Sequence, residues 1–86
     1  MQLSLYKYDT CGYCRWVIQT IRELGLEDRI EMRDVLHEPR YREELRDARG
    51  RGTVPVLRIE DGDSVEWMGE SHDIIRWLKE RFADGD

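Results

Sequence analysis

The feature that most constrains the fold of this chain is a pair of cysteines placed where a strand pattern changes into a helix pattern. Segment 3–8 carries apolar residues on both of its alternating faces, which is typical of a short strand buried on both sides. Cys11 and Cys14 follow it, and apolar residues then recur at helical spacing from Val17 until Gly25, a natural helix end. Cys11 is therefore predicted to lie between a strand and the N-terminus of a helix.

A cysteine at this junction is well placed for nucleophilic chemistry. The thiolate attacks disulfides, and the unpaired N–H groups and partial positive charge of a helix N-terminus favour it. Cys11 is therefore expected to be the nucleophile. Cys14, one turn further into the helix, is expected to be more buried and close enough to resolve a mixed disulfide on Cys11. Lys7 and Arg15 are expected to add positive potential near the pair.

Other uses of the two cysteines fit the sequence less well. A disulfide scaffold normally uses four or more widely spaced cysteines, and a zinc site would need two further ligands. The two histidines of the chain, His37 and His72, are far apart and lack ligand spacing. We therefore predict a catalytic redox pair and no metal site.

Length and charge narrow the class of protein further. The 86 residues suffice for one small domain, 1–86, with a frayed tail over 83–86. A net charge of −5 argues against nucleic-acid binding, which usually shows as a basic patch. No apolar run reaches the roughly 20 residues that span a membrane. The N-terminus lacks the pattern of a signal peptide, so a cytoplasmic location is expected.

The rest of the chain predicts alternating strands and helices of the α/β class. Ser71 is expected to cap the last helix, and residues 60–63 form a hairpin turn signal. The predicted strands are 30–35, 53–59 and 64–68, and the further helices are 39–49 and 71–82. The order is then β-α-β-α-β-β-α. A parallel crossover followed by a hairpin gives a four-stranded mixed sheet flanked by three helices.

Three segments, in this order, resemble a known family. Residues 6–14 resemble the active-site segment of glutaredoxins, in which a tyrosine such as Tyr13 is typical. Residues 52–56 look like the Thr-Val-Pro loop of that family. Residues 70–75 are similar to the Glu-Ser segment that opens the last helix of glutathione-transferase N-terminal domains. The resemblance implies a thioredoxin-like fold and a glutaredoxin related to those transferases, as a domain standing alone.

The resemblance also implies a groove that binds glutathione. Its residues would be Tyr13, Thr53, Val54, Pro55, Glu70 and Ser71. A cis peptide bond before Pro55 would present the Val54 backbone to the cysteine of glutathione. Glu70 and Ser71 would hold the γ-glutamyl end, and a helix N-terminus suits a carboxylate on physical grounds.

Ordinary structural roles remain open for these residues. Segment 53–55 can be a simple strand entry, and Glu70 with Ser71 can serve only as a helix cap. The tryptophans are expected to pack: Trp16, Trp67 and Trp77. One of four arginines is a candidate for the glycine carboxylate of glutathione: Arg40, Arg42, Arg49 or Arg51.

The function implied by the resemblance is that of a dithiol glutaredoxin. Such a monomer reduces disulfide-containing or glutathionylated proteins, uses glutathione as co-substrate and holds no tightly bound cofactor. Gly12 departs from the usual proline between the cysteines, and Tyr8 replaces a basic residue. Gly12 leaves open a second function, a 2Fe–2S cluster bridged between two monomers by Cys11 and glutathione. A third is a thioredoxin-like reductase served by a flavoprotein.

Overall fold

The computed structural model describes residues 1–82 and has the predicted order of elements. The strands are β1 (Gln2–Lys7), β2 (Ile30–Asp34), β3 (Val56–Asp61) and β4 (Ser64–Met68). The helices are α1 (Gly12–Glu23), α2 (Pro39–Arg49) and α3 (Ser71–Phe82). The tail predicted over 83–86 lies outside the described residues. No helix within residues 1–82 has the length and apolar character needed to cross a membrane.

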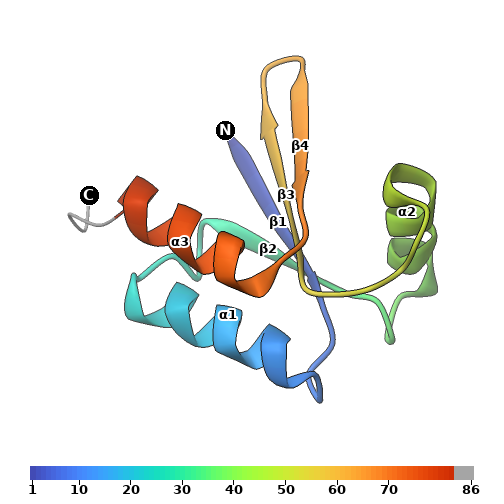
Figure 1. Ribbon diagram of the computed structural model, residues 1–86, viewed down its shortest axis with the longest axis horizontal. Helices are drawn as coiled ribbons and strands as arrows, with labels where there is room; N and C mark the ends of the chain where they lie inside the picture. Colours follow the sequence, from blue (N-terminus) through green and yellow to red (C-terminus); the bar gives the residue numbers. More distant parts are fainter. Residues whose placement is uncertain (83–86) are drawn as a thin grey trace.

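The strands form one mixed sheet in the order β2-β1-β3-β4, with β1 and β3 as its two inner strands (Figure 1). β1 pairs in parallel with β2 and antiparallel with β3, and β3 pairs antiparallel with β4. α1 and α3 lie side by side on one face of the sheet, and α2 lies on the other. This is the predicted thioredoxin-like arrangement of three helices around a four-stranded sheet.

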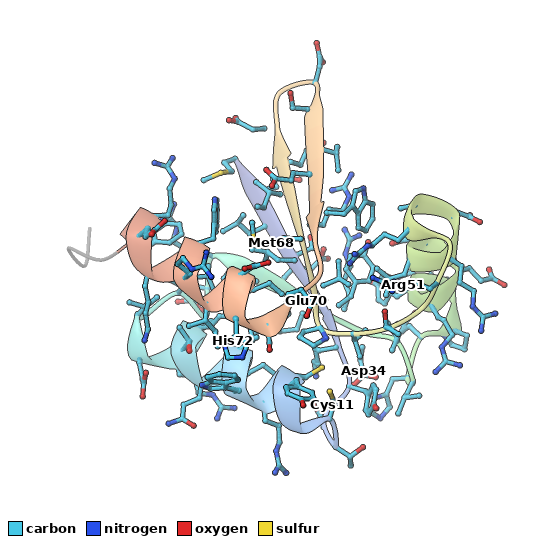
Figure 2. All side chains as sticks on the ribbon, in the orientation of Figure 1. Cys11, Asp34, Arg51, Met68, Glu70 and His72 are labelled. Atoms are coloured by element: carbon cyan, nitrogen blue, oxygen red, sulfur yellow. The ribbon has the colours of Figure 1, made fainter. Side chains whose placement is uncertain are left out.

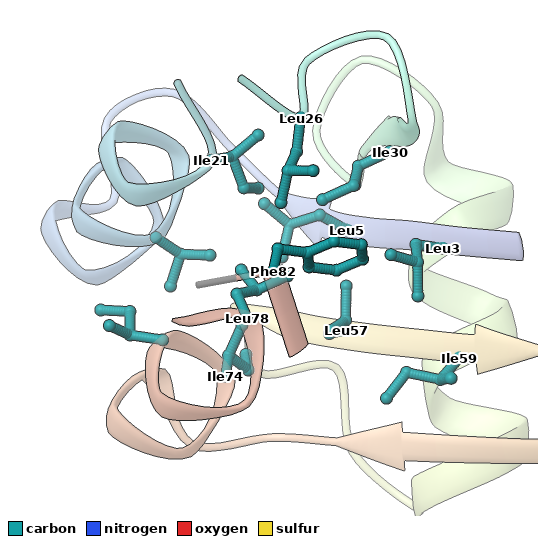
Figure 3. Close-up of a cluster of buried hydrophobic side chains, with 12 residues drawn as sticks. Leu3, Leu5, Ile21, Leu26, Ile30, Leu57, Ile59, Ile74, Leu78 and Phe82 are labelled. Carbon is teal, nitrogen blue, oxygen red and sulfur yellow. The ribbon is translucent and has the colours of Figure 1, made fainter. Parts of the chain in front are cut away.

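β1 is buried on both faces, as its sequence pattern predicted. Leu3 and Leu5 point into the main core, which α1 and α3 complete with residues such as Ile21 and Leu78 (Figure 3). Tyr6 points to the opposite face and contributes to a smaller core beneath α2. The alternation of side chains along a strand therefore ties both helical layers to β1.

Two helix ends depend on glycine. α1 ends at Glu23 with Leu24 as its C-cap, and the next residue, Gly25, has a φ of 70°. The N–H groups of Gly25 and Leu26 donate to the carbonyls of Arg22 and Ile21 at 3.1 and 3.0 Å. This is the Schellman arrangement, which satisfies carbonyls that the helix leaves unpaired. Gly50 ends α2 in the same left-handed region, with a φ of 76°.

The first strand, predicted over 3–8, is shifted by one residue, and the second, predicted over 30–35, ends one residue early. Two other predicted boundaries differ by more than one residue. The strand predicted over 53–59 begins at Val56 and continues to Asp61. Pro55 has no N–H to donate to a ladder, so segment 53–55 forms a loop before the strand. The Val54–Pro55 peptide in this loop is cis. The turn is shorter than predicted, because Asp61 pairs with Ser64 and a positive φ at Gly62 reverses the chain.

Replacing Gly25 by alanine should destabilise the fold. A side chain at a positive φ costs about 1 kcal/mol, so Gly25→Ala should lower the free energy of unfolding by about that amount. Gly12→Ala is the matched control, since the φ of Gly12 is not positive and an added Cβ would contact nothing within 4 Å. Urea denaturation of both variants measures the difference, and equal losses at the two positions would contradict this account of the helix end.

Candidate active site

Cys11 occupies the N-cap position of α1, as the sequence predicted. Its backbone is extended, with φ of −81° and ψ of 119°, and its carbonyl accepts the first helical hydrogen bond from Arg15 N–H at 3.0 Å. The Cys14 N–H donates to the Cys11 Sγ at 3.4 Å. The first turn of α1 contains no acidic residue. The sulfur therefore faces the positive end of the helix with no carboxylate of that turn opposing it.

Cys14 is fully buried, whereas Cys11 is partly exposed, which confirms the predicted difference in burial. Burial raises the pKa of the Cys14 thiol to about 12, and the hydrogen bond with the Cys11 sulfur acts in the same direction. A hydrogen bond with the Tyr8 backbone and the charge of Lys7 oppose this rise. Cys14 therefore keeps its proton at neutral pH.

Lys7 lies close enough to the cysteine pair for its charge to act against the raised pKa of the Cys14 thiol. Its ammonium group contacts Asp9 at 2.6 Å and Asp34 at 3.4 Å, so most of its charge is compensated. Asp34 in turn accepts hydrogen bonds from the N–H groups of Leu36 and His37. The expected positive potential from Lys7 is thus present but shared with two carboxylates. Arg15 is exposed on α1.

A groove of about 390 Å³ borders the first turn of α1 at Tyr13, and neither Cys11 nor Cys14 is among the residues that line it. All six residues that the resemblance assigned to glutathione binding line this groove: Tyr13, Thr53, Val54, Pro55, Glu70 and Ser71. They come from α1, from the loop between α2 and β3, and from the start of α3. Cys11 is two residues from Tyr13, at the end of α1 that borders the groove. Figure 2 shows Cys11, Arg51 and Glu70 around this meeting point.

The N-terminus of α3 forms one end of the groove. Ile74 N–H donates to the Glu70 carbonyl at 2.9 Å, so Glu70 holds the N-cap position and Ser71 is the first helical residue. The prediction that Ser71 caps the helix was therefore wrong by one residue. The N–H groups of the first turn have no acceptor within the helix, and such a terminus favours anions.

Three further residues line the groove, namely Arg51, Gly69 and His72. Arg51 was one of the four arginines proposed from the sequence, whereas Arg40 contacts Glu38 at 3.2 Å and does not line the groove. Gly69 was not predicted. Its position lies against the guanidinium group of Arg49, which occupies the space that a Cβ would need. The one feature of the sequence that could have indicated Gly69 is a lone glycine between a strand pattern and a helix pattern.

The described residues offer no metal site of their own. Within residues 1–82 no group of three or more His, Cys, Asp or Glu side chains could hold a metal ion. Any metal cluster at Cys11 would therefore need ligands from outside these residues. By itself, the site provides a dithiol. The groove next to it has one end, at the N-terminus of α3, that favours anions.

The family model for the N-terminal domain of glutathione S-transferase matches residues 5–85. No curated protein matches the chain. Maleylacetoacetate isomerase from Anaeromyxobacter dehalogenans, in a structure with GSH bound in its active site, is 26% identical, with a TM-score of 0.70; the match covers 96% of this chain and 38% of that chain.

Two other solved structures are similar to the chain. A trimeric glutathione transferase from Leishmania is 27% identical, with a TM-score of 0.75, over 96% of this chain and 18% of that chain. Glutathione transferase Omega 2C from Trametes versicolor shares the fold, with a TM-score of 0.77 and 15% identity, over 98% of this chain and 39% of that chain. The chain thus spans less than two fifths of the length of each of the three. The match to nearly all of its residues shows that it belongs to the family of glutathione S-transferase N-terminal domains.

Proposed function

We propose that this domain is a glutathione-dependent thiol–disulfide oxidoreductase of the dithiol glutaredoxin type. The observation that supports this most is the pairing of a partly exposed Cys11 at the N-terminus of α1 with a buried, protonated Cys14. Exposure of one sulfur and burial of the other separate the two roles that such an enzyme needs. The family membership and the groove beside the pair support glutathione as the thiol that drives turnover.

Cys11 alone would carry out the reduction of a glutathionylated protein. Its thiolate attacks the glutathione sulfur, a Cys11–glutathione disulfide forms, and the target leaves as a thiolate that takes up a proton. A second glutathione thiolate then attacks the sulfur of the bound glutathione. Oxidised glutathione leaves, and the thiolate of Cys11 is restored. One free glutathione thiol is consumed for each glutathionylated protein reduced, because the other half of the oxidised glutathione comes from the mixed disulfide itself.

Cys14 would be needed for an intramolecular disulfide of a target protein. Cys11 attacks one target sulfur and forms a mixed disulfide, leaving the other target sulfur as a thiol. Cys14 then attacks the Cys11 sulfur, and its proton passes to the departing target sulfur. The buried position of Cys14 behind Cys11 suits attack from the protein side while the target leaves towards solvent. Two glutathione molecules then reduce the Cys11–Cys14 disulfide.

The groove would hold glutathione through its three charged groups. The γ-glutamyl carboxylate lies at the N-terminus of α3, on the N–H groups that follow Glu70, and its ammonium group faces the Glu70 carboxylate. The backbone of Val54 pairs with the cysteine of glutathione. Arg51, at the other side of the groove, takes the glycine carboxylate. These contacts direct the glutathione sulfur towards Cys11.

A second candidate function is the 2Fe–2S cluster bridged between two copies. The observation that favours it is that Gly12 places no side chain next to Cys11, and the space that a Cβ would occupy at Gly12 is open, with nothing within 4 Å. Each copy would supply Cys11 and one glutathione as ligands. The dimer would then act as a carrier of the cluster or as a sensor. Visible absorption after anaerobic purification with glutathione separates this candidate from a colourless monomeric reductase.

Substitution of each cysteine tests the division of roles. Cys11→Ser should lower the turnover of both substrate types by about a hundredfold or more, because a serine hydroxyl is not ionised at neutral pH. Cys14→Ser should keep the reduction of glutathione mixed disulfides and lose that of intramolecular disulfides. Coupled assays with glutathione measure both activities. Activity in Cys11→Ser, or loss of deglutathionylation in Cys14→Ser, would contradict the assignment.

The glutathione groove can be tested independently of the cysteines. Glu70→Gln should raise the KM for glutathione by about tenfold, because a charge-assisted hydrogen bond to the ammonium group is lost. Glu80→Gln, which removes an exposed carboxylate from the same helix but outside the groove, is the matched control. In an NMR titration with glutathione, the amide signals of Thr53, Val54 and Ser71 should shift. Shifts confined to Cys11, or equal KM values for the two variants, would exclude this groove.

A further inference from the structure

Arginines of α2 lie across glycines in the two segments that flank the groove. A Cβ at Gly52, in the loop after α2, would meet a side-chain carbon of Arg42 at 3.0 Å and Nε of Arg46 at 3.6 Å. At Gly69, between β4 and α3, the three atoms nearest to an added Cβ all belong to the guanidinium group of Arg49. α2 therefore contacts both segments through arginine side chains.

The contact of Arg49 with Gly69 joins the two sides of the groove. Arg49 is the last residue of α2, so the loop that carries Arg51 follows it directly. Gly69 directly precedes Glu70, the N-cap of α3. Arg51 and Glu70 both line the groove (Figure 2). The contact therefore connects the loop on one side with the helix N-terminus on the other.

Arg49 makes this contact from outside the groove. A second cavity, of about 490 Å³, shares the junction between β4 and α3 with the groove, because Gly69 and Glu70 line both. Arg49 lines the second cavity and not the groove. Its guanidinium group therefore supports the junction without standing where glutathione would bind.

The charges around the second cavity help to keep the guanidinium group of Arg49 there. Four carboxylates line this cavity: Glu66, Glu70, Asp73 and Glu80. Arg76, which also lines it, pairs with Asp73 at 3.3 Å. The half-buried Arg49 is therefore attracted towards the junction, where the missing side chain of Gly69 leaves space for its planar group.

We propose that Arg49 is a positioning residue for the γ-glutamyl end of glutathione. By lying against Gly69, it fixes the junction between β4 and α3 relative to α2, and so holds Glu70 and the N–H groups of the first turn of α3 ready for the ligand. A wall that is already fixed loses little freedom when the ligand binds. The proposal rests on the proposed function, because it concerns the glutathione that the groove would hold.

Three mixed disulfides test this proposal. Each joins 2-mercaptoethanol to one thiol, which is glutathione, γ-glutamylcysteine (without the glycine) or cysteinylglycine (without the γ-glutamyl group). Arg49→Ala should raise the KM for the first two by about fivefold, because the site for the γ-glutamyl group is no longer fixed before binding. The KM for the third substrate and the three kcat values should stay unchanged. A purely structural defect would instead lower kcat for all three.

Gly69→Ala displaces the same guanidinium group without removing it. The φ of Gly69 is not positive, so the backbone accepts alanine, and the flexible end of Arg49 gives way to the new Cβ. This variant should raise the same two KM values by about fivefold. The double variant Arg49→Ala/Gly69→Ala should stay near fivefold rather than reach about 25-fold, because the atoms nearest to the Cβ are then absent.

Arg40→Ala is the matched control, because Arg40 lies exposed at the other end of α2 and does not line the groove. It should leave every KM unchanged. Arg49→Gln replaces the alanine variant if that variant folds poorly.

Unchanged KM values for the γ-glutamyl substrates in the Arg49 variants or in Gly69→Ala would overturn the proposal. A fully multiplicative double variant would do the same. So would a loss confined to the two substrates that contain glycine, because it would place Arg49 on the glycine carboxylate. A wild-type chain that does not turn over the glutathione mixed disulfide would instead refute the proposed function.

Discussion

The hydrogen bond from the Cys14 N–H to the Cys11 sulfur is the contact on which the site depends. It exists because Cys11 is the N-cap of α1, which follows β1 after a short turn. β1 is an inner strand on which both cores are built, so its end is a well-fixed point of the fold. The position of the reactive sulfur is thereby determined by the most buried part of the chain.

Packing brings the N-terminus of α3 close to the N-terminus of α1. α3 lies beside α1 over the main core, through residues such as Ile74 and Leu78. Glu70 and Ser71 therefore lie on the same side of the domain as Cys11, and the loop after α2 closes the groove between them. The site therefore favours negative charge at two points. One is the Cys11 sulfur at the N-terminus of α1, and the other is the N-terminus of α3, which suits the carboxylate of a ligand.

α2 is attached to the sheet in a different way from α1 and α3. Leu45 is its one fully buried side chain, and its neighbour Glu44 accepts a hydrogen bond from the Tyr6 hydroxyl at 2.7 Å. Arg33 donates to the same hydroxyl at 2.6 Å, and burial raises the pKa of Tyr6 to about 12. Since the groove loop begins directly after α2, this polar contact helps to hold Arg51 and segment 53–55 in position.

The sequence predicted the elements because their periodicities are strong, and it predicted the members of the groove because their motifs resemble a family. It placed the start of β3 and the cap of α3 incorrectly, since the Val54–Pro55 loop and the Glu70 carbonyl decide these boundaries. It also missed the contact of Arg49 with Gly69 and the edge-to-face contact of Trp16 with His72. Such contacts join elements distant in sequence, and no local pattern encodes them.

The separation of the two cysteines into an exposed nucleophile and a buried, protonated partner is the central claim. Alkylation of the native dithiol protein with iodoacetamide, followed by peptide mass mapping across a range of pH, tests it most directly. Cys11 should be labelled rapidly at neutral pH. Cys14 should stay unlabelled until the protein unfolds or the pH approaches the pKa of about 12 that burial gives its thiol. Equal labelling of both cysteines at neutral pH, or faster labelling of Cys14, would contradict the account.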